Sequence, residues 1–161
     1  MPRHLLLDGV AIEDGWQELG EDPLPDNGAW IIGFDRWRRE RSDFVARGGL
    51  LGVKLEAVHR VEDLAPDLPL LSLVAANFPG PSDGRGYTQA RLLRERYGFK
   101  GELRACGYVR RDQVFFLARC GFNALELPAA ELASAEQGFL TFSAAYQASN
   151  DTGLPARLLR R

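Results

Sequence analysis

Residues 70–86, LLSLVAANFPGPSDGRG, contain the strongest structural signal in this sequence. The run from Leu70 to Ala76 is apolar and of strand length, which is typical of a strand whose sheet is covered on both faces. The residues that follow it, 77–86, are rich in glycine and proline and predict a loop. A buried strand that ends in such a loop before a helix indicates a β-α unit.

The sequence before this stretch already alternates between strand and helix patterns. In order, it predicts a hairpin over residues 5–16 with its turn at Asp8-Gly9, a strand at 29–34, a helix at 36–46, a strand at 50–55 and a short helix at 61–64. Asp35 stands where the N-cap of the first helix is expected. Gly48 and Gly49 are expected to end that helix, because glycine tolerates the backbone conformation found there.

The sequence after residue 86 continues the same alternation. It predicts a helix with Tyr87, Ala90, Leu93 and Tyr97 on one face, a strand at 103–106, a helix that begins at Asp112, a strand at 124–127 and a final helix over 131–146. The pattern Arg-x-Gly-Phe occurs at residues 96–99 and again at 119–122. Each copy is expected at a helix-to-strand junction, where glycine ends the helix and phenylalanine supplies an apolar contact.

These elements predict the α/β class. We expect a single domain over residues 1–147, built from alternating β-α units with a mainly parallel sheet, right-handed crossovers and a short N-terminal hairpin. The sequence leaves open whether the sheet is open or resembles part of a barrel. A complete eight-fold barrel is not expected, since about 250 residues are typical of one. Residues 148–161 lack a periodic apolar face and are expected to form a flexible tail.

Composition limits the possible classes of protein. The chain has 161 residues, of which 45% are hydrophobic, and a net charge of −2, so collagen-like and disordered acidic chains are excluded. No apolar run approaches the roughly 18 residues of a membrane span, and Asp8 interrupts the first apolar run, so we expect no signal peptide. We therefore expect a cytoplasmic protein without a membrane partner. The near-neutral charge gives no reason to expect a nucleic-acid partner.

The net charge is unevenly distributed along the chain. Residues 81–121 contain 9 Lys and Arg against 4 Asp and Glu, a balance of +5, whereas residues 1–80 have a balance of −6. The basic block consists either of solvated helix faces or of a surface that meets an anion or an acidic partner.

Candidate sites follow from the rule that α/β folds bind ligands beyond the carboxyl ends of their parallel strands. Three segments qualify, namely the loop at 77–86, the loop at 107–113 and the turn after Glu126. The first contains Asp83-Gly84-Arg85-Gly86, whose backbone N–H groups and guanidinium could hold a phosphate, sulfate or carboxylate. In the alternative interpretation, Asp83 caps its helix and Arg85 pairs with an acidic side chain such as Glu102.

The second loop contains Arg110-Arg111-Asp112-Gln113 at a predicted helix start. Two cations at a helix N-terminus oppose the helix dipole. We therefore expect them to be offset by Asp112, by a carboxylate elsewhere in the chain or by a bound anion.

Other kinds of chemistry find little support in the residues. The first loop lacks the further glycines and the Lys-Ser/Thr pair of a nucleotide-binding loop. Cys106 and Cys120 do not form a Cys-x-x-Cys pair and are expected to be ordinary buried thiols. His4 and His59 have no matching carboxylate cluster, so no metal site is expected. No motif for a nucleophilic serine is present.

A resemblance to a known family rests on the block DGRGYTQARLLRERYGF at residues 83–99, on GELRA at 101–105, on Asp112-Gln113 and on RCGF at 119–122. With these segments, the sequence resembles a bacterial family, domain of unknown function 934. The resemblance covers most of residues 5–147 and is strongest over 77–127. The sequence departs from the family's usual pattern at Pro81, where an aromatic residue is common, and at Asn123, where aspartate is common.

The family is encoded beside assimilatory sulfite reductase and phosphoadenylyl-sulfate reductase, and it is often labelled a probable oxidoreductase of sulfite reduction. The resemblance thus implies a role in sulfur assimilation and cysteine biosynthesis. The residues show no flavin or nicotinamide fingerprint, no cluster-binding cysteine set and no redox cysteine pair. The catalytic residues are therefore unknown, no cofactor is predicted, and it is left open whether the protein is an enzyme.

We expect an accessory protein that binds sulfite reductase or its electron donor through the basic central surface. One alternative is a small α/β enzyme or sensor that binds sulfite, sulfate or a sulfonucleotide at an Arg/Gly-rich site, and another is a homo-oligomer whose sheets cover each other. The residues expected to bind the partner or the anion are Asp83, Gly84, Arg85, Gly86, Tyr87, Arg91, Arg94, Arg104, Arg110, Arg111, Asp112 and Gln113.

Overall fold

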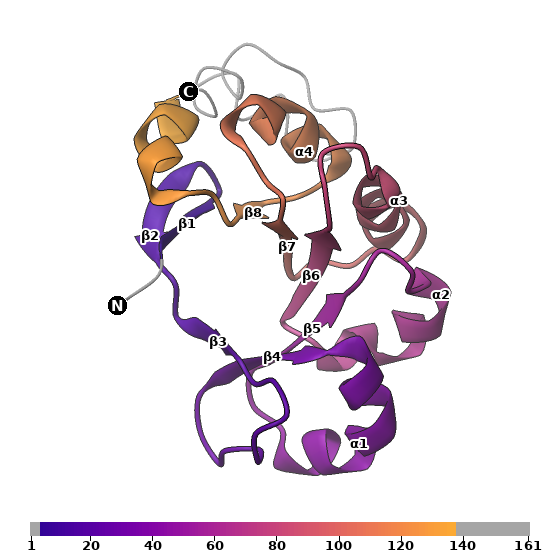
Figure 1. Ribbon diagram of the computed structural model, residues 1–161. Helices are drawn as coiled ribbons and strands as arrows, with labels where there is room; N and C mark the ends of the chain where they lie inside the picture. The colour runs from indigo at the N-terminus through magenta and orange to yellow at the C-terminus, as the bar shows by residue number, and fades with distance from the viewer. Residues whose placement is uncertain (1–3, 138–161) are drawn as a thin grey trace.

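A single curled sheet organises the computed structural model, which describes residues 4–137 (Figure 1). Its eight strands lie in the order β2-β1-β8-β7-β6-β5-β4-β3. The strands are β1 (His4–Leu7), β2 (Val10–Glu13), β3 (Trp16–Glu18), β4 (Ala29–Gly33), β5 (Leu51–Leu55), β6 (Leu73–Phe78), β7 (Glu102–Gly107) and β8 (Ala124–Leu125). The sheet resembles half a barrel, with the helices on its outer side.

The strand pairing confirms the α/β class and the N-terminal hairpin, and it corrects the prediction of a mainly parallel sheet. Strands β3 to β8 pair in parallel, whereas β1 is antiparallel to both β2 and β8. The sheet is therefore mixed. Two strands joined by a tight turn must be antiparallel, and the sequence did not reveal that this hairpin joins the same sheet beside β8.

The two edge strands of the curled sheet, β2 and β3, follow each other directly in the sequence. Edge strand β2 ends at Glu13 and edge strand β3 begins at Trp16, so that only Asp14 and Gly15 separate them. The chain thus passes from one edge of the sheet directly to the other (Figure 1). Of the two predicted forms, the structure has the one that resembles part of a barrel. Strand β3 was not predicted, because three residues are too few to show an alternating pattern.

The helices follow the predicted alternation closely. They are α1 (Phe34–Arg47), α2 (Val61–Leu64), α3 (Arg85–Arg91) and α4 (Val114–Cys120), with short helical turns at Ala65–Leu70, Leu92–Arg96, Arg111–Gln113 and Ala129–Glu131. The predicted N-cap at Asp35 is wrong, because α1 begins at Phe34 with Gly33 as its N-cap. Asp35 lies in the first turn, where a negative charge still favours the helix dipole.

The predicted last helix begins as expected, but only part of it can be compared with the structure. Residues 132–137 are helical, and the rest of the predicted range 131–146 lies outside the described residues. The expected tail at 148–161 lies outside them as well. None of the helices among residues 4–137 is long and apolar enough to cross a membrane.

The two faces of the sheet have different compositions. The outer face carries the main core, in which Ile32, Val53, Val74 and Leu103 are fully buried beneath the helices. Because side chains alternate along a strand, the residues between these core positions lie on the inner face. A second, smaller apolar cluster is found there, formed by Ile31, Leu73, Ala75 and Cys106 with Trp16 packed against it. The same face also carries charged residues, which are described below.

The two Arg-x-Gly-Phe segments form the predicted helix ends. Gly98 has a φ of +63° and Gly121 a φ of +110°, a region of backbone conformation that favours glycine. The phenylalanine that follows each glycine is buried and donates its backbone N–H to the preceding helix, Phe99 to the carbonyl of Leu93 and Phe122 to that of Leu117. These contacts end each helix and direct the chain into the next strand.

Candidate functional site

The predicted loops after β6, β7 and β8 all lie at the carboxyl-terminal ends of these strands, on the same side of the sheet, because the three strands are parallel neighbours. The first of these loops, after β6, contains an ion pair between two of its own residues, Asp83 and Arg85. Asp83 Oδ1 accepts hydrogen bonds from both the backbone N–H and the Nε of Arg85, each at 3.0 Å. Hydrogen bonds from Arg85 lower the pKa of Asp83 to about 2. Arg85 is thus paired within its own loop, and Glu102 binds Arg104 instead.

The glycine and tyrosine of the same loop have packing roles. A Cβ on Gly86 would lie 2.6 Å from the ring of Phe78, so only glycine fits beneath that ring. The Tyr87 ring packs against Phe78 and also against Phe116 of α4, with 4.7 Å between the Tyr87 and Phe116 centroids. Its hydroxyl accepts a hydrogen bond from Gln113 at 3.3 Å. These contacts join α3 to α4 and to the loop after β7.

A carboxylate from outside the second loop, that of Glu131, binds its arginines. Glu131 binds the guanidinium of Arg110 at 2.7 Å and accepts the backbone N–H of Arg111 at 3.0 Å. The side chain of Gln113 accepts the backbone N–H of Arg110 at 2.8 Å and caps the short helical turn. The expected offset of the two cations is therefore a carboxylate from elsewhere in the chain. Asp112 is exposed.

Arg94 serves as an internal link between segments. Its guanidinium donates hydrogen bonds to the carbonyl oxygens of Phe99, Gly101 and Gly121 at 2.7–2.9 Å. A further hydrogen bond, at 3.2 Å, runs to the side-chain oxygen of Asn123, which also accepts the N–H of Leu103. Arg94 thus holds the ends of both helix-to-strand junctions together and does not present its charge to a partner.

We expect Arg94→Ala to lower the free energy of unfolding by about 2 kcal/mol, because it leaves partly buried carbonyl oxygens without their donor. Urea denaturation followed by circular dichroism measures this loss. The matched control is Arg96→Ala, since Arg96 is exposed and stacks on Tyr97 at 5.5 Å. Equal stability of the two variants would contradict the assigned role of Arg94.

Arg104 lies in a buried charge cluster on the inner face of the sheet. Its side chain is 0% exposed and contacts Asp14 at 2.8 Å, Glu102 at 2.7 Å and Glu126 at 3.6 Å. Burial lowers the pKa of Arg104, but the hydrogen bonds and charges of Asp14 and Glu102 together raise it by more. The pKa of Arg104 therefore lies above its usual value. The guanidinium therefore joins β7 to the connection between β2 and β3, across the curl of the sheet.

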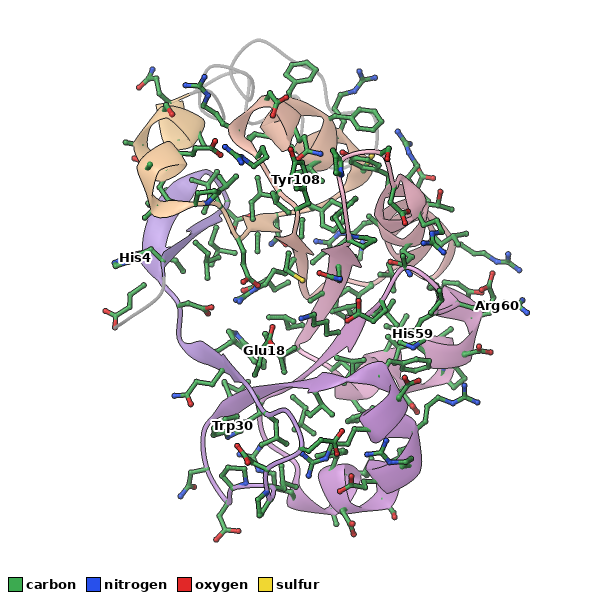
Figure 2. All side chains as sticks on the ribbon, viewed as in Figure 1. His4, Glu18, Trp30, His59, Arg60 and Tyr108 are labelled. Atoms are coloured by element: carbon green, nitrogen blue, oxygen red, sulfur yellow. The ribbon has the colours of Figure 1, made fainter. Side chains whose placement is uncertain are left out.

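A pocket of about 530 Å³ opens beside this cluster, beyond the ends of β7 and β8. Figure 2 shows Tyr108 just after β7, and His4 on β1. Polar side chains around the pocket are those of His4, Asp14, Tyr108, Arg110 and Glu126, and the apolar ones include Val109, Leu127 and Leu132. Sequence reasoning placed Arg110 and the turn after Glu126 at this edge of the sheet. It missed His4 and Asp14, since nothing in the sequence shows that the hairpin lies beside β8.

A second cluster of polar side chains lies along the inner face of the sheet, toward β3 (Figure 2). Lys54 Nζ is 3.1 Å from a carboxylate oxygen of Glu18, and Asn77 donates to Glu56 at 2.7 Å. Burial lowers the pKa of Lys54, but the hydrogen bond to Glu18 and the charges of Glu18 and Glu56 raise it, and the resulting pKa lies above its usual value. Lys54 is therefore a paired ammonium group at neutral pH and a poor nucleophile.

Neither cysteine is activated. Both are buried and free, as predicted. Burial raises the pKa of Cys106 to about 12, and it raises that of Cys120 as well. A thiol needs a lowered pKa to react at neutral pH. In the part of the chain that the structure describes, no group of His, Cys, Asp or Glu side chains could hold a metal ion.

The geometry divides the predicted site residues into two groups. Arg94 and Arg104 are held inside the fold, and Gly86 and Tyr87 pack the junction of α3 with α4. The remaining residues reach the surface around α3, α4 and the pocket. No curated protein matches the sequence. The family described as "Bacterial protein of unknown function (DUF934)" matches residues 52–157, a range that includes both candidate loops, strands β6 to β8 and all but the first residue of β5. With about two thirds of its length matched, the chain belongs to this family.

Proposed function

We propose that this protein is an accessory protein of assimilatory sulfite reduction, which binds sulfite reductase or its electron donor. The resemblance over residues 83–122 implies this pathway, because the family that the sequence resembles is encoded beside sulfite reductase. The observation that carries the docking proposal is a surface on α3 and α4 that combines exposed aromatic rings with arginines.

What we call the α3–α4 surface consists of Arg85 and Arg91 of α3, Phe115 and Phe116 of α4, and Arg111 of the helical turn just before α4. The side chains of Phe115 and Phe116 are 48% and 44% exposed, which is unusual for large aromatic rings. Aromatic residues and arginine are the types enriched in protein interfaces and in their energetically dominant positions. The composition of the surface therefore favours a macromolecular partner.

The charge of the surface favours an acidic partner, although less strongly than the +5 balance of residues 81–121 implied. Arg94 and Arg104 of that block are turned inward. Asp83 pairs with Arg85, and Glu95 lies 3.7 Å from Arg91. The Arg91–Glu95 pair is the looser of the two, with side chains 39% and 51% exposed, and a surface pair of this kind contributes little energy, so Arg91 can exchange its partner for a carboxylate of another protein. Small electron-transfer proteins with acidic surfaces fit these requirements.

The alternative of a small sulfur-pathway anion bound at the Arg/Gly-rich site has less support. Asp83 already occupies the guanidinium of Arg85 and would compete with an incoming anion. Beside Arg110, the pocket also contains the carboxylates of Asp14 and Glu126, which repel sulfite or sulfate.

The docking proposal is tested with purified sulfite reductase and its purified electron donor, each presented separately in biolayer interferometry. We expect one of them to bind the wild-type protein with an affinity that falls as salt is added, because the contact is partly ionic. The double variant Phe116→Ala with Arg111→Ala is expected to bind at least about tenfold more weakly, since an aromatic anchor and an arginine are lost.

The matched control combines Val58→Ala with Arg60→Ala, which removes an exposed apolar side chain and an exposed arginine from the loop before α2. Equal weakening by both double variants, or no binding by the wild type, would contradict the proposal. If Phe116 instead joined two copies of this chain, sedimentation would show a concentration-dependent mass that Phe116→Ala abolishes.

A further inference from the structure

His59 lies in the connection between β5 and α2 (Figure 2), and each of its two ring nitrogens takes part in a hydrogen bond. Nδ1 accepts the backbone N–H of Glu56 at 2.9 Å. Because a backbone N–H can only donate, Nδ1 carries no proton in this arrangement. The proton of the neutral ring is therefore on Nε2, which lies 3.1 Å from Oδ1 of Asp35 and donates to that carboxylate.

The pair of His59 and Asp35 resembles part of a catalytic triad, but its geometry does not suit a general base. A base needs an unprotonated nitrogen that faces the substrate, and Nδ1 of His59 is occupied by the chain itself. The ring is also largely enclosed, with 13% of the side chain exposed and Phe34 packed against it at 5.0 Å between ring centroids. The contacts of the ring instead hold the loop at residues 56–59.

The 56–59 loop is bound to two neighbouring elements. Asn77 of β6 donates to the carboxylate of Glu56, and Nε2 of Gln89 on α3 donates to the carbonyl oxygens of Glu56 at 2.9 Å and His59 at 3.0 Å. Gln89 is 5% exposed, and its Oε1 is buried without a hydrogen-bond partner among residues 4–137. A buried amide that loses its remaining partners is costly. The position of α3 is therefore coupled to these two carbonyl groups.

We propose that the 56–59 loop is a pH-sensitive switch, closed when His59 is neutral and open when its ring is protonated. The added proton binds Nδ1, where it points at the N–H of Glu56, so that a donor faces a donor. The hydrogen bond between them breaks, and the ring and the backbone of Glu56 separate. Gln89 transmits this movement to α3, because it binds the carbonyl oxygen of the same residue.

Asp35 determines which side of the broken hydrogen bond moves. Its carboxylate accepts from Nε2 in both states, and this hydrogen bond becomes charge-assisted, and therefore stronger, when the ring is positive. The ring thus stays beside α1 while the backbone at Glu56 moves away. The other charged side chains near the ring have partners of their own: Glu56 binds Asn77, Arg60 pairs with Glu62 at 3.6 Å, and Arg38 stacks on Phe34.

The test follows the wild-type protein by NMR between about pH 8 and pH 5, the range in which histidine changes charge. Imidazole nitrogen shifts report the tautomer and protonation of His59, and hydrogen exchange reports the Glu56 amide. We expect the neutral ring to carry its proton on Nε2. As the ring becomes charged, protection of the Glu56 N–H, relative to its intrinsic exchange rate at each pH, should fall at least about fivefold. The side-chain amide signals of Gln89 should shift with the same midpoint.

His59→Asn is the matched variant, because its Oδ1 stands where histidine has Nδ1, accepts the same N–H and takes up no proton. In this variant, the Glu56 and Gln89 signals are expected to stay constant over the same range of pH. His4→Gln removes the other histidine of the chain, on β1, and is expected to keep the full response.

The switch is overturned when the wild-type ring stays neutral down to about pH 5 or carries its proton on Nδ1. It is also overturned when protection of the Glu56 amide is unchanged by protonation of His59, or when His59→Asn responds to pH as the wild type does. These outcomes are independent of whether sulfite reductase binds the α3–α4 surface.

Discussion

Replacing Arg104 by alanine is expected to lower the free energy of unfolding by about 4 kcal/mol, the effect of breaking a buried ion pair by removal of one partner. The side chain is 0% exposed, and the side chain of Asp14, which it contacts at 2.8 Å, is only 2% exposed. Without the guanidinium, the buried carboxylate of Asp14 and the partly buried one of Glu102 lose their shared counter-ion. Total stabilities of about 5–15 kcal/mol are usual, so this variant should be marginally folded at room temperature.

Urea denaturation of the variant, monitored by tryptophan fluorescence, measures the loss. Arg39→Ala is the matched control, because the side chain of Arg39 is 56% exposed and its ion pairs within residues 4–137 are with the surface carboxylates of Glu21 and Glu40. A second variant separates charge from packing. Adding Asp14→Ala to Arg104→Ala removes one of the stranded charges, so the pair should cost less than the sum of the single losses. Strict additivity, or a loss below about 1 kcal/mol for Arg104→Ala, would contradict the assigned role of the cluster.

The sequence predicts those parts of the fold that depend on local patterns. The apolar run before Asn77 and the two Gly-Phe junctions were correctly placed, because apolar periodicity and glycine at a helix end act over a few residues. The mixed sheet was missed for a related reason. No local signal in residues 4–13 indicates that the hairpin pairs with β8, more than a hundred residues away.

The candidate site was predictable in position but not in partners. Parallel strands bring their carboxyl ends together, so the loops containing Arg85 and Arg110 were correctly assigned to one edge of the sheet. The pairing of Arg110 with Glu131 and of Arg104 with Asp14 depends on side chains distant in sequence. A count of arginines cannot separate those that face solvent from those that bind carbonyl oxygens, as Arg94 does. Charge per segment therefore overestimates the basic surface.

The second large effect is expected from Gly107→Ala at the end of β7. Gly107 has a φ of +83°, a conformation that costs an L-residue about 1–3 kcal/mol. A Cβ at this position would also collide with the side-chain oxygen of Asn77 and the carbonyl oxygen of Phe78. Phe78 O accepts the N–H of Tyr108 at 2.7 Å, so the backbone cannot move away without losing this hydrogen bond. The two effects together should lower the free energy of unfolding by at least about 3 kcal/mol.

Thermal and urea denaturation of Gly107→Ala test this expectation, with Gly80→Ala as the control. Gly80 lies in the loop after β6, and a Cβ there meets no atom within 4 Å. Its replacement should change stability by less than about 0.5 kcal/mol. If Gly107→Ala kept wild-type stability, the left-handed backbone and the close contacts at this position would not be what requires glycine there.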